Sequence, residues 1–189
     1  MGKEKHLEEE IEGEYLLTVA RKSIRLYLEK GEILSVPADE EIPEPFRSAK
    51  ATFVSIKKKG ELRGCIGTII PQRRNVVEET IYNAIDAAVS DPRFPSLSVE
   101  ELDECRLSVD VLSPLERVYS KEELNPARYG VFIIQGGRSA VLLPDLPNIT
   151  TVEEQLRIVM LKGGISPDLP YEMYRFTVQR WTEKRGEKK

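Results

Sequence analysis

A short hairpin in the first half of the chain constrains its fold more than any other segment. Residues 51–58 and 62–70 read as strands, and Lys59-Gly60 between them is a turn signal. Two strands joined by so short a connection pair antiparallel, because a parallel pair needs a crossover of a dozen or more residues. The hairpin therefore predicts antiparallel pairing within the sheet.

The register of this hairpin decides which side chains share a face. Turn chemistry favours a two-residue loop at Lys59-Gly60, whereas the side-chain pattern favours a loop of three residues. We adopt the three-residue loop, because a slip by one residue would mix apolar and polar side chains on both faces. The apolar face then holds Val54, Ile56, Leu62 and Ile66. The polar face holds Ser55, Lys57, Arg63 and Cys65.

The second strand has a composition that packing alone does not explain. It places Cys65, one of only two cysteines in the chain, between Gly64 and Gly67 and close after Arg63. Glycine weakens a strand, so it marks a bulge or a close approach by a ligand or another backbone. A neighbouring guanidinium favours the thiolate form of a cysteine. The segment therefore predicts a site with a nucleophile and an anion-binding side chain.

Helical and extended patterns alternate along the rest of the chain. Helical patterns cover residues 10–30, 75–90, 98–101 and 151–162. Strand patterns cover residues 105–112, 130–135, 139–143 and 173–181. Strands joined by hairpins and separated by helices indicate an α+β fold, with a mixed, largely antiparallel β-sheet and flanking helices. We expect residues 1–14 to form a mobile N-terminus and residues 184–189 a disordered tail.

Composition argues against several classes of protein. The chain has 189 residues, of which 40% are hydrophobic and 32% are charged, and this fits a soluble domain with its own core. Its net charge of −4 argues against nucleic-acid binding, which usually needs a basic surface. We expect no membrane span and no signal peptide. Two cysteines without a disulfide framework suggest reduced thiols and a cytoplasmic location.

Missing residue types narrow the chemistry further. The only histidine, His6, lies in the N-terminal region, so we expect no Cys-His or Ser-His arrangement in the ordered domain. Cys65 and Cys105 are far apart in sequence and have no other soft ligand near them, which argues against a zinc site. The sequence lacks the glycine-rich motifs of the common nucleotide-binding folds. We therefore predict no metal and no cofactor.

Five short motifs, taken in order, resemble one known family. They are LRGCIG at residues 62–67, DPRFPSL at 91–97, VLSP at 111–114, LLPD at 142–145 and YRF at 174–176. Together they resemble the AMMECR-one domain family, as a single domain over residues 15–183. Two further stretches, RYGV at 128–131 and TVEEQ at 151–155, resemble its prokaryotic branch, called AmmeMemoRadiSam system protein A.

The resemblance implies an α+β fold with a larger and a smaller subdomain, and no established biochemical activity. It also implies a Memo-like protein and a radical-SAM protein as partners. Some family members carry a histidine at the position of Tyr129 and a cysteine near Val159, and this chain has neither. A mechanism that needed those two residues would not operate here.

Cys65 and Asp91 are the candidate catalytic residues. Cys65 is either a nucleophile or redox thiol, or a small half-buried residue chosen because a larger side chain would not fit. Asp91 would have to accept a proton, since no histidine is available. The alternative role of Asp91 is to fix Arg93 by a salt bridge in the loop that follows the helix at residues 75–90.

Six residues form the candidate ligand-binding set: Arg63, Gly64, Gly67, Arg93, Ser55 and Lys57. Arg63 would hold a phosphate or carboxylate through its guanidinium, or else form a surface or cross-strand ion pair. Gly64 and Gly67 would let a ligand approach, or else bend the strand. Ser55 and Lys57 join the set only through the register adopted above.

Two function classes follow, and the sequence leaves open whether the protein is an enzyme. In the first, a binding module holds a small ligand or a partner segment and works with the Memo-like and radical-SAM proteins. In the second, an enzyme uses Cys65 as a thiolate on an anionic small substrate. A nucleic-acid role rests only on the basic residues 57–59 and 73–74, which a solvated charged face explains as well. We prefer the binding module.

Overall fold

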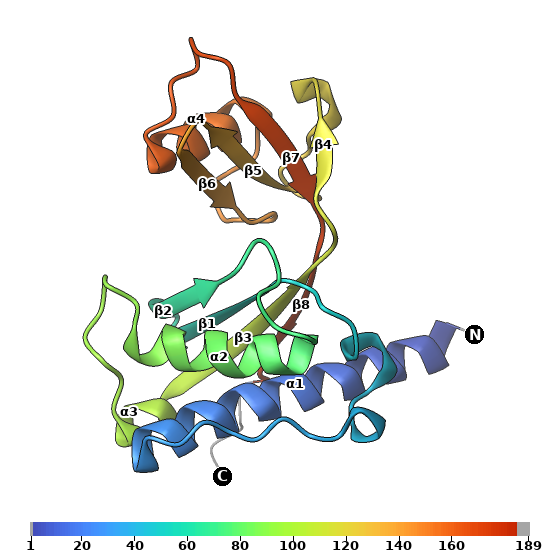
Figure 1. Ribbon diagram of the computed structural model, residues 1–189, viewed down its shortest axis with the longest axis vertical. Helices are drawn as coiled ribbons and strands as arrows, with labels where there is room; N and C mark the ends of the chain where they lie inside the picture. The colour runs from blue at the N-terminus through green and yellow to red at the C-terminus, as the bar shows by residue number, and fades with distance from the viewer. Residues whose placement is uncertain (1, 185–189) are drawn as a thin grey trace. The chain divides into compact units, whose positions relative to one another are not determined.

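The computed structural model describes residues 2–184 of the chain, and the side chains of residues 10–184. These residues form two compact units, one larger and one smaller (Figure 1). Of the described residues, 2–111 and 179–184 form the first unit, and 112–178 form the second. The predicted α+β class, with a larger and a smaller subdomain, is confirmed.

The first unit is built on a four-stranded sheet, which we call sheet A. Its strand order is β2 (Glu61–Gly67), β1 (Thr52–Lys58), β3 (Cys105–Leu112) and β8 (Val178–Thr182). Its helices are α1 (Gly2–Lys30), α2 (Val76–Val89) and the short α3 (Val99–Asp103). Two 3-10 turns, Asp39–Glu41 and Glu44–Phe46, lie in the connector after α1. β1 pairs antiparallel with both β2 and β3.

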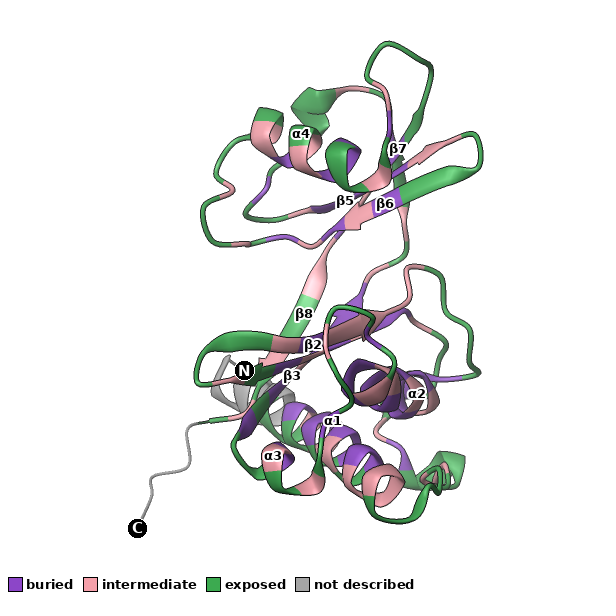
Figure 2. Ribbon diagram, turned by 90° about the vertical axis from the view of Figure 1, so that its left-hand side faces the viewer, coloured by how far each residue is buried: buried purple, intermediate pink, exposed green. Residues whose placement is uncertain are grey.

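Helices α2 and α1 cover one face of sheet A, and the apolar sides of both helices are buried there. α2 packs on β1 and β2, and α1 packs against α2. The fully or almost fully buried residues of these sides are Leu16, Ala20, Ile24, Val77, Ile81, Ala84, Ile85 and Ala88. From the sheet they meet Val54, Ile56, Leu107 and Val109. Figure 2 shows these buried sides of α1 and α2 turned toward the strands.

The hairpin satisfies both of the conflicting sequence signals. Lys59 and Gly60 have φ values of 53° and 91°, as in the two-residue turns that hairpins favour. The register shifts between Ile56 and Lys57, so that β2 contains one extra residue at a bulge. Beyond the bulge the pairing is that of the three-residue loop that we predicted.

The second unit has a four-stranded sheet of its own, which we call sheet B. Its order is β4 (Glu116–Val118), β7 (Glu172–Phe176), β5 (Gly130–Gln135) and β6 (Arg138–Leu142). Helix α4 (Val152–Gly163) packs on β5 and β6, and a 3-10 turn, Lys121–Glu123, follows β4. Thr151 caps the start of α4, where its side chain accepts from the Glu154 N–H, and the helix ends at Gly164, whose φ of 58° only glycine adopts at little cost.

Several predicted boundaries were wrong. The strand predicted at residues 173–181 is two strands, β7 in sheet B and β8 in sheet A, and β4 was not predicted. The two strands separate at Thr177, whose backbone N–H donates to Ser113 Oγ (2.9 Å) and whose carbonyl accepts from Ser113 N–H (3.0 Å). α1 begins at Gly2 rather than at residue 10. The mobility of residues 1–14 stays a prediction, and residues 185–189 of the predicted tail lie outside the described residues.

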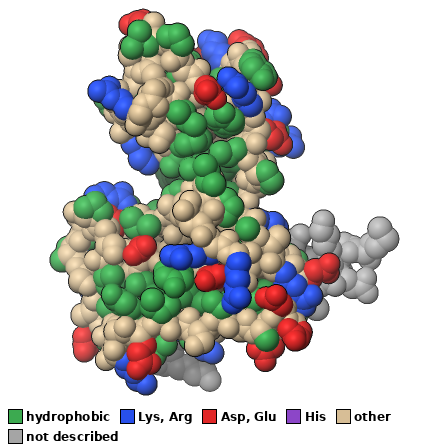
Figure 3. Space-filling view, viewed as in Figure 1, with side chains coloured by type: hydrophobic (Ala, Val, Ile, Leu, Met, Phe, Trp, Pro, Cys, Tyr) green, Lys and Arg blue, Asp and Glu red, His purple; other side chains and the backbone are tan. Residues whose placement is uncertain are grey.

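Among the described residues, no helix has both the length and the apolar composition that crossing a bilayer requires. Charges of both signs occur on the surface. On the face drawn in Figure 3, Lys and Arg side chains are interspersed with Asp and Glu side chains.

Candidate functional site

Half of the candidate residues lie on the face of sheet A that is turned away from α1 and α2, which we call the outer face. Strand alternation and register place nine residues there: Phe53, Ser55 and Lys57 of β1, Leu62, Cys65 and Gly67 of β2, and Arg106, Ser108 and Asp110 of β3. Arg180 of β8 joins them through its ion pair with Asp110. The outer face is therefore built by all four strands of sheet A.

Three small polar side chains form a row across the outer face. Ser55 pairs with Cys65 on one side and with Ser108 on the other. The Ser55 hydroxyl donates to Cys65 Sγ at 3.1 Å. All three residues are partly exposed. The row is flanked by larger side chains, Phe53 on one side and Lys57 on the other.

The thiol of Cys65 is not activated. Burial raises the pKa of Cys65, and the hydrogen bond from Ser55 and the charge of Arg93 only partly oppose that rise. The carboxylates of Asp110 and Asp91 raise the pKa of this thiol further. Since the thiolate is the nucleophile, a raised pKa leaves Cys65 as a neutral thiol at neutral pH.

Asp91 and Arg93 bind the backbone of Cys65 at the edge of sheet A. The Cys65 N–H donates to Asp91 Oδ2 at 2.9 Å, and Arg93 donates to the Cys65 carbonyl at 3.2 Å. Arg93 also donates to both oxygens of Asp91, at 2.9 Å and 2.7 Å. β2 is an edge strand, and this loop occupies the outward N–H and C=O of Cys65 that a further strand would otherwise pair with.

These contacts make Asp91 a poor proton acceptor. Its side chain is only 2% exposed, and both of its oxygens accept hydrogen bonds. The hydrogen bonds from Arg93 and from the Cys65 backbone hold the pKa of Asp91 well below its ordinary value, in spite of burial. The geometry fits the structural alternative, in which Asp91 fixes Arg93 and the strand edge, better than it fits a general base.

The shared face predicted for Arg63 and Cys65 was wrong, because the bulge turns Arg63 to the helix side of the sheet. Arg63 makes a two-pronged ion pair with Glu101 of α3, at 2.8 Å and 2.9 Å, and donates to the carbonyl of Pro95 at 2.9 Å. The same bulge places Leu62 opposite Lys57, so Leu62 lies on the outer face and is 40% exposed. Arg63 therefore takes the ion-pair role that the sequence left open.

The two glycines of β2 admit parts of the protein itself. A Cβ on Gly64 would lie 2.1 Å from the backbone oxygen of Ala87 in α2, so the missing side chain lets helix and sheet approach. A Cβ on Gly67 would lie 2.3 Å from the ring of Phe53. Close packing explains both glycines without a ligand.

Sequence reasoning missed four residues of the outer face: Arg106, Ser108, Asp110 and Arg180. Arg106, Ser108 and Asp110 could have been predicted to share one face, since they occupy every second position of the strand predicted at residues 105–112. Arg180 could not have been placed in this way, because its strand changes sheets at Thr177. The Arg180 guanidinium donates to both oxygens of Asp110, at 2.7 Å and 3.0 Å.

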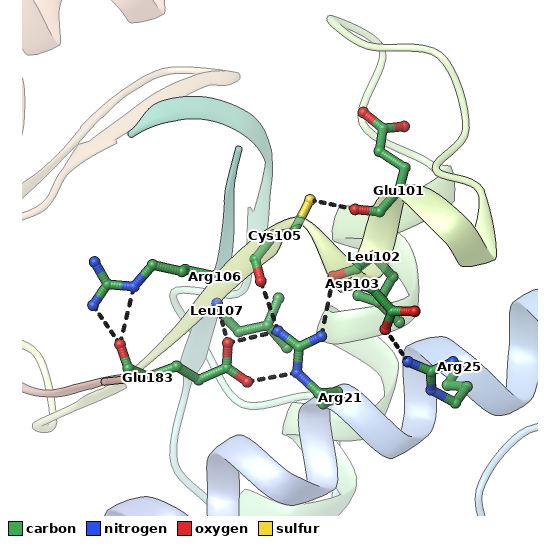
Figure 4. A network of polar contacts seen from close by, with 9 residues as sticks. All are labelled: Arg21, Arg25, Glu101, Leu102, Asp103, Cys105, Arg106, Leu107 and Glu183. Carbon is green, nitrogen blue, oxygen red and sulfur yellow. Dashed lines mark hydrogen bonds and ion pairs between the residues drawn. The ribbon is translucent and has the colours of Figure 1, made fainter. Parts of the chain in front are cut away.

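An ion-pair network at the end of β8 holds this strand in place (Figure 4). Arg21 of α1 donates to both oxygens of Glu183, each at 2.6 Å, and to the carbonyls of Leu102 and Cys105. Glu183 also accepts from the N–H of Leu107 at 2.8 Å. The Cys105 thiol donates to the carbonyl of Glu101, and burial raises the pKa of Cys105. Cys105 is thus a buried thiol apart from the outer face.

Within the part of the chain whose side chains are described, no three His, Cys, Asp or Glu residues lie close enough together to hold a metal ion. His6 lies outside those side chains. The outer face offers instead one neutral thiol, two hydroxyls, three cationic groups and one buried carboxylate. Such a set binds by hydrogen bonds and charge.

Comparison with known proteins gives a consistent picture. The model of the AMMECR1 family matches residues 17–181. A protein of Thermotoga maritima is 46% identical over 165 residues, which cover 86% of this chain and 94% of that protein. A protein of Clostridium acetobutylicum is 44% identical over 87% of this chain, but the match covers only 35% of that longer protein.

A solved structure shares the fold. The crystal structure of an uncharacterised protein from Pyrococcus horikoshii superposes with a TM-score of 0.85 and is 32% identical in sequence. The match covers 92% of each chain, so the likeness extends over both units.

Proposed function

Because the chain belongs to the AMMECR1 family, we propose that it is a binding module whose working surface is the outer face of sheet A. In this proposal Cys65 takes part as a neutral, hydrogen-bonded thiol and forms no covalent intermediate. The single observation that carries the proposal is the row Cys65–Ser55–Ser108, which is partly exposed on a sheet face that α1 and α2 leave free.

The environment of Cys65 supports binding over catalysis. An enzyme working through this residue would need a thiolate and a base, and the thiol pKa is raised while Asp91 is engaged by Arg93. Arg63, the cation expected to activate the thiol, is paired with Glu101 instead. What is left on the outer face is a set of hydrogen-bonding groups suited to holding a ligand or a partner.

The resemblance to AmmeMemoRadiSam system protein A names the partners that we propose. They are the Memo-like protein and the radical-SAM protein of the same organism. We also propose a cytoplasmic location, where reducing conditions would keep Cys65 and Cys105 as the free thiols that they are here.

The working surface can be tested by blocking it. Ser108→Trp would place a large side chain in the row of small ones without changing the charge. We expect this variant to lose the complex with the Memo-like or radical-SAM protein, measured by size-exclusion chromatography of mixtures at micromolar concentration. Ser139→Trp, on an exposed position of β6, is the matched control and should keep the complex. If the two variants behave alike, the outer face is not the working surface.

The role of the thiol has a separate test. In a Cys105→Ser background, the rate of alkylation by iodoacetamide across pH reports the pKa of Cys65 alone. We expect a value above the ordinary one of about 8.5. Cys65→Ser should also keep the complex, because a hydroxyl replaces the neutral thiol. A pKa well below the ordinary value would restore the enzyme hypothesis.

A further inference from the structure

The outer face is positively charged although the whole chain is acidic. Its charged side chains are Lys57, Arg106 and Arg180 against one carboxylate, Asp110, whereas the chain carries a net charge of −4. Lys57 and Arg106 are exposed and directly opposite each other on neighbouring strands. The Arg106 guanidinium donates to the carbonyl of Glu183 through Nε (3.1 Å) and Nη2, so it is held toward the β8 side of the face while it stays charged and exposed.

Asp110 fixes Arg180 on the Phe53 side of the row, the side opposite Lys57 and Arg106. The Asp110 side chain is 3% exposed, and its two oxygens each accept from the Arg180 guanidinium, whose own side chain is 35% exposed. A guanidinium fixed in this way loses little further side-chain entropy on binding. Asp110 is therefore a positioning residue, and Arg180 keeps a charged group at the surface.

The row between these cations has the dimensions of an extended chain. Neighbouring strands lie about 4.8 Å apart, so the four strands of sheet A span about 14 Å. An extended segment rises about 3.3 Å per residue, so about four residues cross the face. The small side chains of Cys65, Ser55 and Ser108 let a backbone come close, and their hydroxyl and thiol groups can hydrogen-bond its peptide groups.

From these observations we infer that the occupant of the outer face is an acidic, extended segment of a partner protein, which crosses the row Cys65–Ser55–Ser108 between the cations of β1, β3 and β8. This inference rests on the proposed function, and it adds the sign and the shape of what is bound. The carboxylates of the segment pair with Lys57, Arg106 and Arg180, and its backbone lies on the small polar row.

The test uses a labelled hexaglutamate peptide as the probe, with hexalysine as the control for sign. We expect fluorescence anisotropy to show that the parent protein binds hexaglutamate and not hexalysine, and that binding weakens as salt is raised to about 0.15 M. The double variant Lys57→Glu/Arg106→Glu should weaken binding by about tenfold, since two attractions become two repulsions. The matched double variant Lys22→Glu/Arg157→Glu makes the same charge change on exposed residues of α1 and α4 and should bind like the parent.

The outcomes of these experiments distinguish a failure of this inference from a failure of the proposed function. If Ser108→Trp abolishes the partner complex while Lys57→Glu/Arg106→Glu leaves it intact, the outer face is the working surface but its occupant is not acidic. If inorganic phosphate at equal charge competes as well as hexaglutamate does, the site takes a free anion and the extended-segment inference is overturned. If the parent fails to bind hexaglutamate at low salt, the inference fails directly. Arg180→Ala removes the cation that Asp110 positions and should weaken hexaglutamate binding while thermal unfolding shows the variant folded; unchanged binding would remove Arg180, and with it the positioning role of Asp110, from the site.

Discussion

Within the LRGCIG segment, Gly64 has the least room for an added side chain, and this gives a quantitative prediction. Gly64 lies in β2 opposite Ile56, where α2 crosses the sheet. An added Cβ would lie 2.1 Å from the backbone oxygen of Ala87. Gly64→Ala therefore tests whether this glycine serves the packing of α2 on sheet A, as the structure indicates, or the approach of a ligand.

The size of the effect follows from that distance. Ordinary contact of a Cβ begins at 3.4 Å, so strand and helix must separate by about 1.3 Å. The clashing atom belongs to the backbone of a helix and cannot rotate away. Overpacking of this kind costs about 1–3 kcal/mol, and the rigid neighbour places Gly64→Ala near the upper end. For a chain of this length, about 3 kcal/mol lowers the melting temperature by about 6–12 °C.

The chain provides a convenient reporter. Its only tryptophan, Trp181, lies in β8 of the first unit, the unit that contains Gly64. Urea unfolding followed by tryptophan fluorescence therefore reports the unit in which the change is made, while far-UV circular dichroism reports both units. We expect the fluorescence midpoint to fall for Gly64→Ala.

Gly137→Ala is the matched control. A Cβ at Gly137 meets nothing within 4 Å, so this variant should unfold within about 0.5 kcal/mol of the parent. A Gly64→Ala protein as stable as the parent would refute the packing argument and return Gly64 to the ligand-binding set. Equal losses in both variants would show that glycine flexibility, rather than the contact with Ala87, sets the cost.

Three further predictions concern stability. Asp91→Asn should destabilise the protein by about 2 kcal/mol in urea unfolding, because charge-assisted hydrogen bonds to Arg93 and to the Cys65 backbone are weakened. Since folding lowers the pKa of Asp91, the stability from its ionised form is present above about pH 4 and is lost as the pH falls through the folded value, so the gap between parent and variant should narrow in acid. Glu183→Gln should lower the free energy of unfolding, followed by tryptophan fluorescence in urea, by about 1–3 kcal/mol, because Arg21 loses its charged partner beside two buried carbonyls. An unchanged free energy would contradict the role of Glu183 in holding β8. Gly164→Ala should cost about 1 kcal/mol in the second unit, measured by circular dichroism, because its φ of 58° strains any residue with a Cβ; no loss would argue against that cap.

The hairpin shows what the local sequence can predict and what it cannot. Turn chemistry at Lys59-Gly60 and the alternation of β1 were both correct, although they implied different registers. A bulge reconciles them, and no local pattern showed which residue it would displace. The residue displaced at the bulge is Arg63, which forms an ion pair with Glu101 of α3 on the helix side of the sheet. Since α3 is distant in sequence, the side of the sheet taken by Arg63 was beyond sequence reasoning.

The candidate site was likewise predictable only where its residues lie close together in the sequence. Alternation within one hairpin placed Ser55, Lys57 and Cys65 together, and the structure keeps them on one face, where Gly67 joins them. Asp91 and Arg93 were linked to each other by their spacing in the loop, and they do pair. Their hold on the Cys65 backbone depends on where the loop after α2 meets the edge of sheet A, which is a long-range contact.

The sequence by itself determined the helices and most of the strands, since each depends on the spacing of apolar residues and on turn and cap residues close by. It also determined that LRGCIG holds a cysteine between two glycines, and it suggested an activated thiol. Only the tertiary structure decided that Arg63 faces α3, that burial raises the pKa of Cys65, and that β8 brings Arg180 to Asp110. Those outcomes depend on which distant segments meet, because charge pairing and desolvation act between residues brought together in space, whatever their separation along the chain.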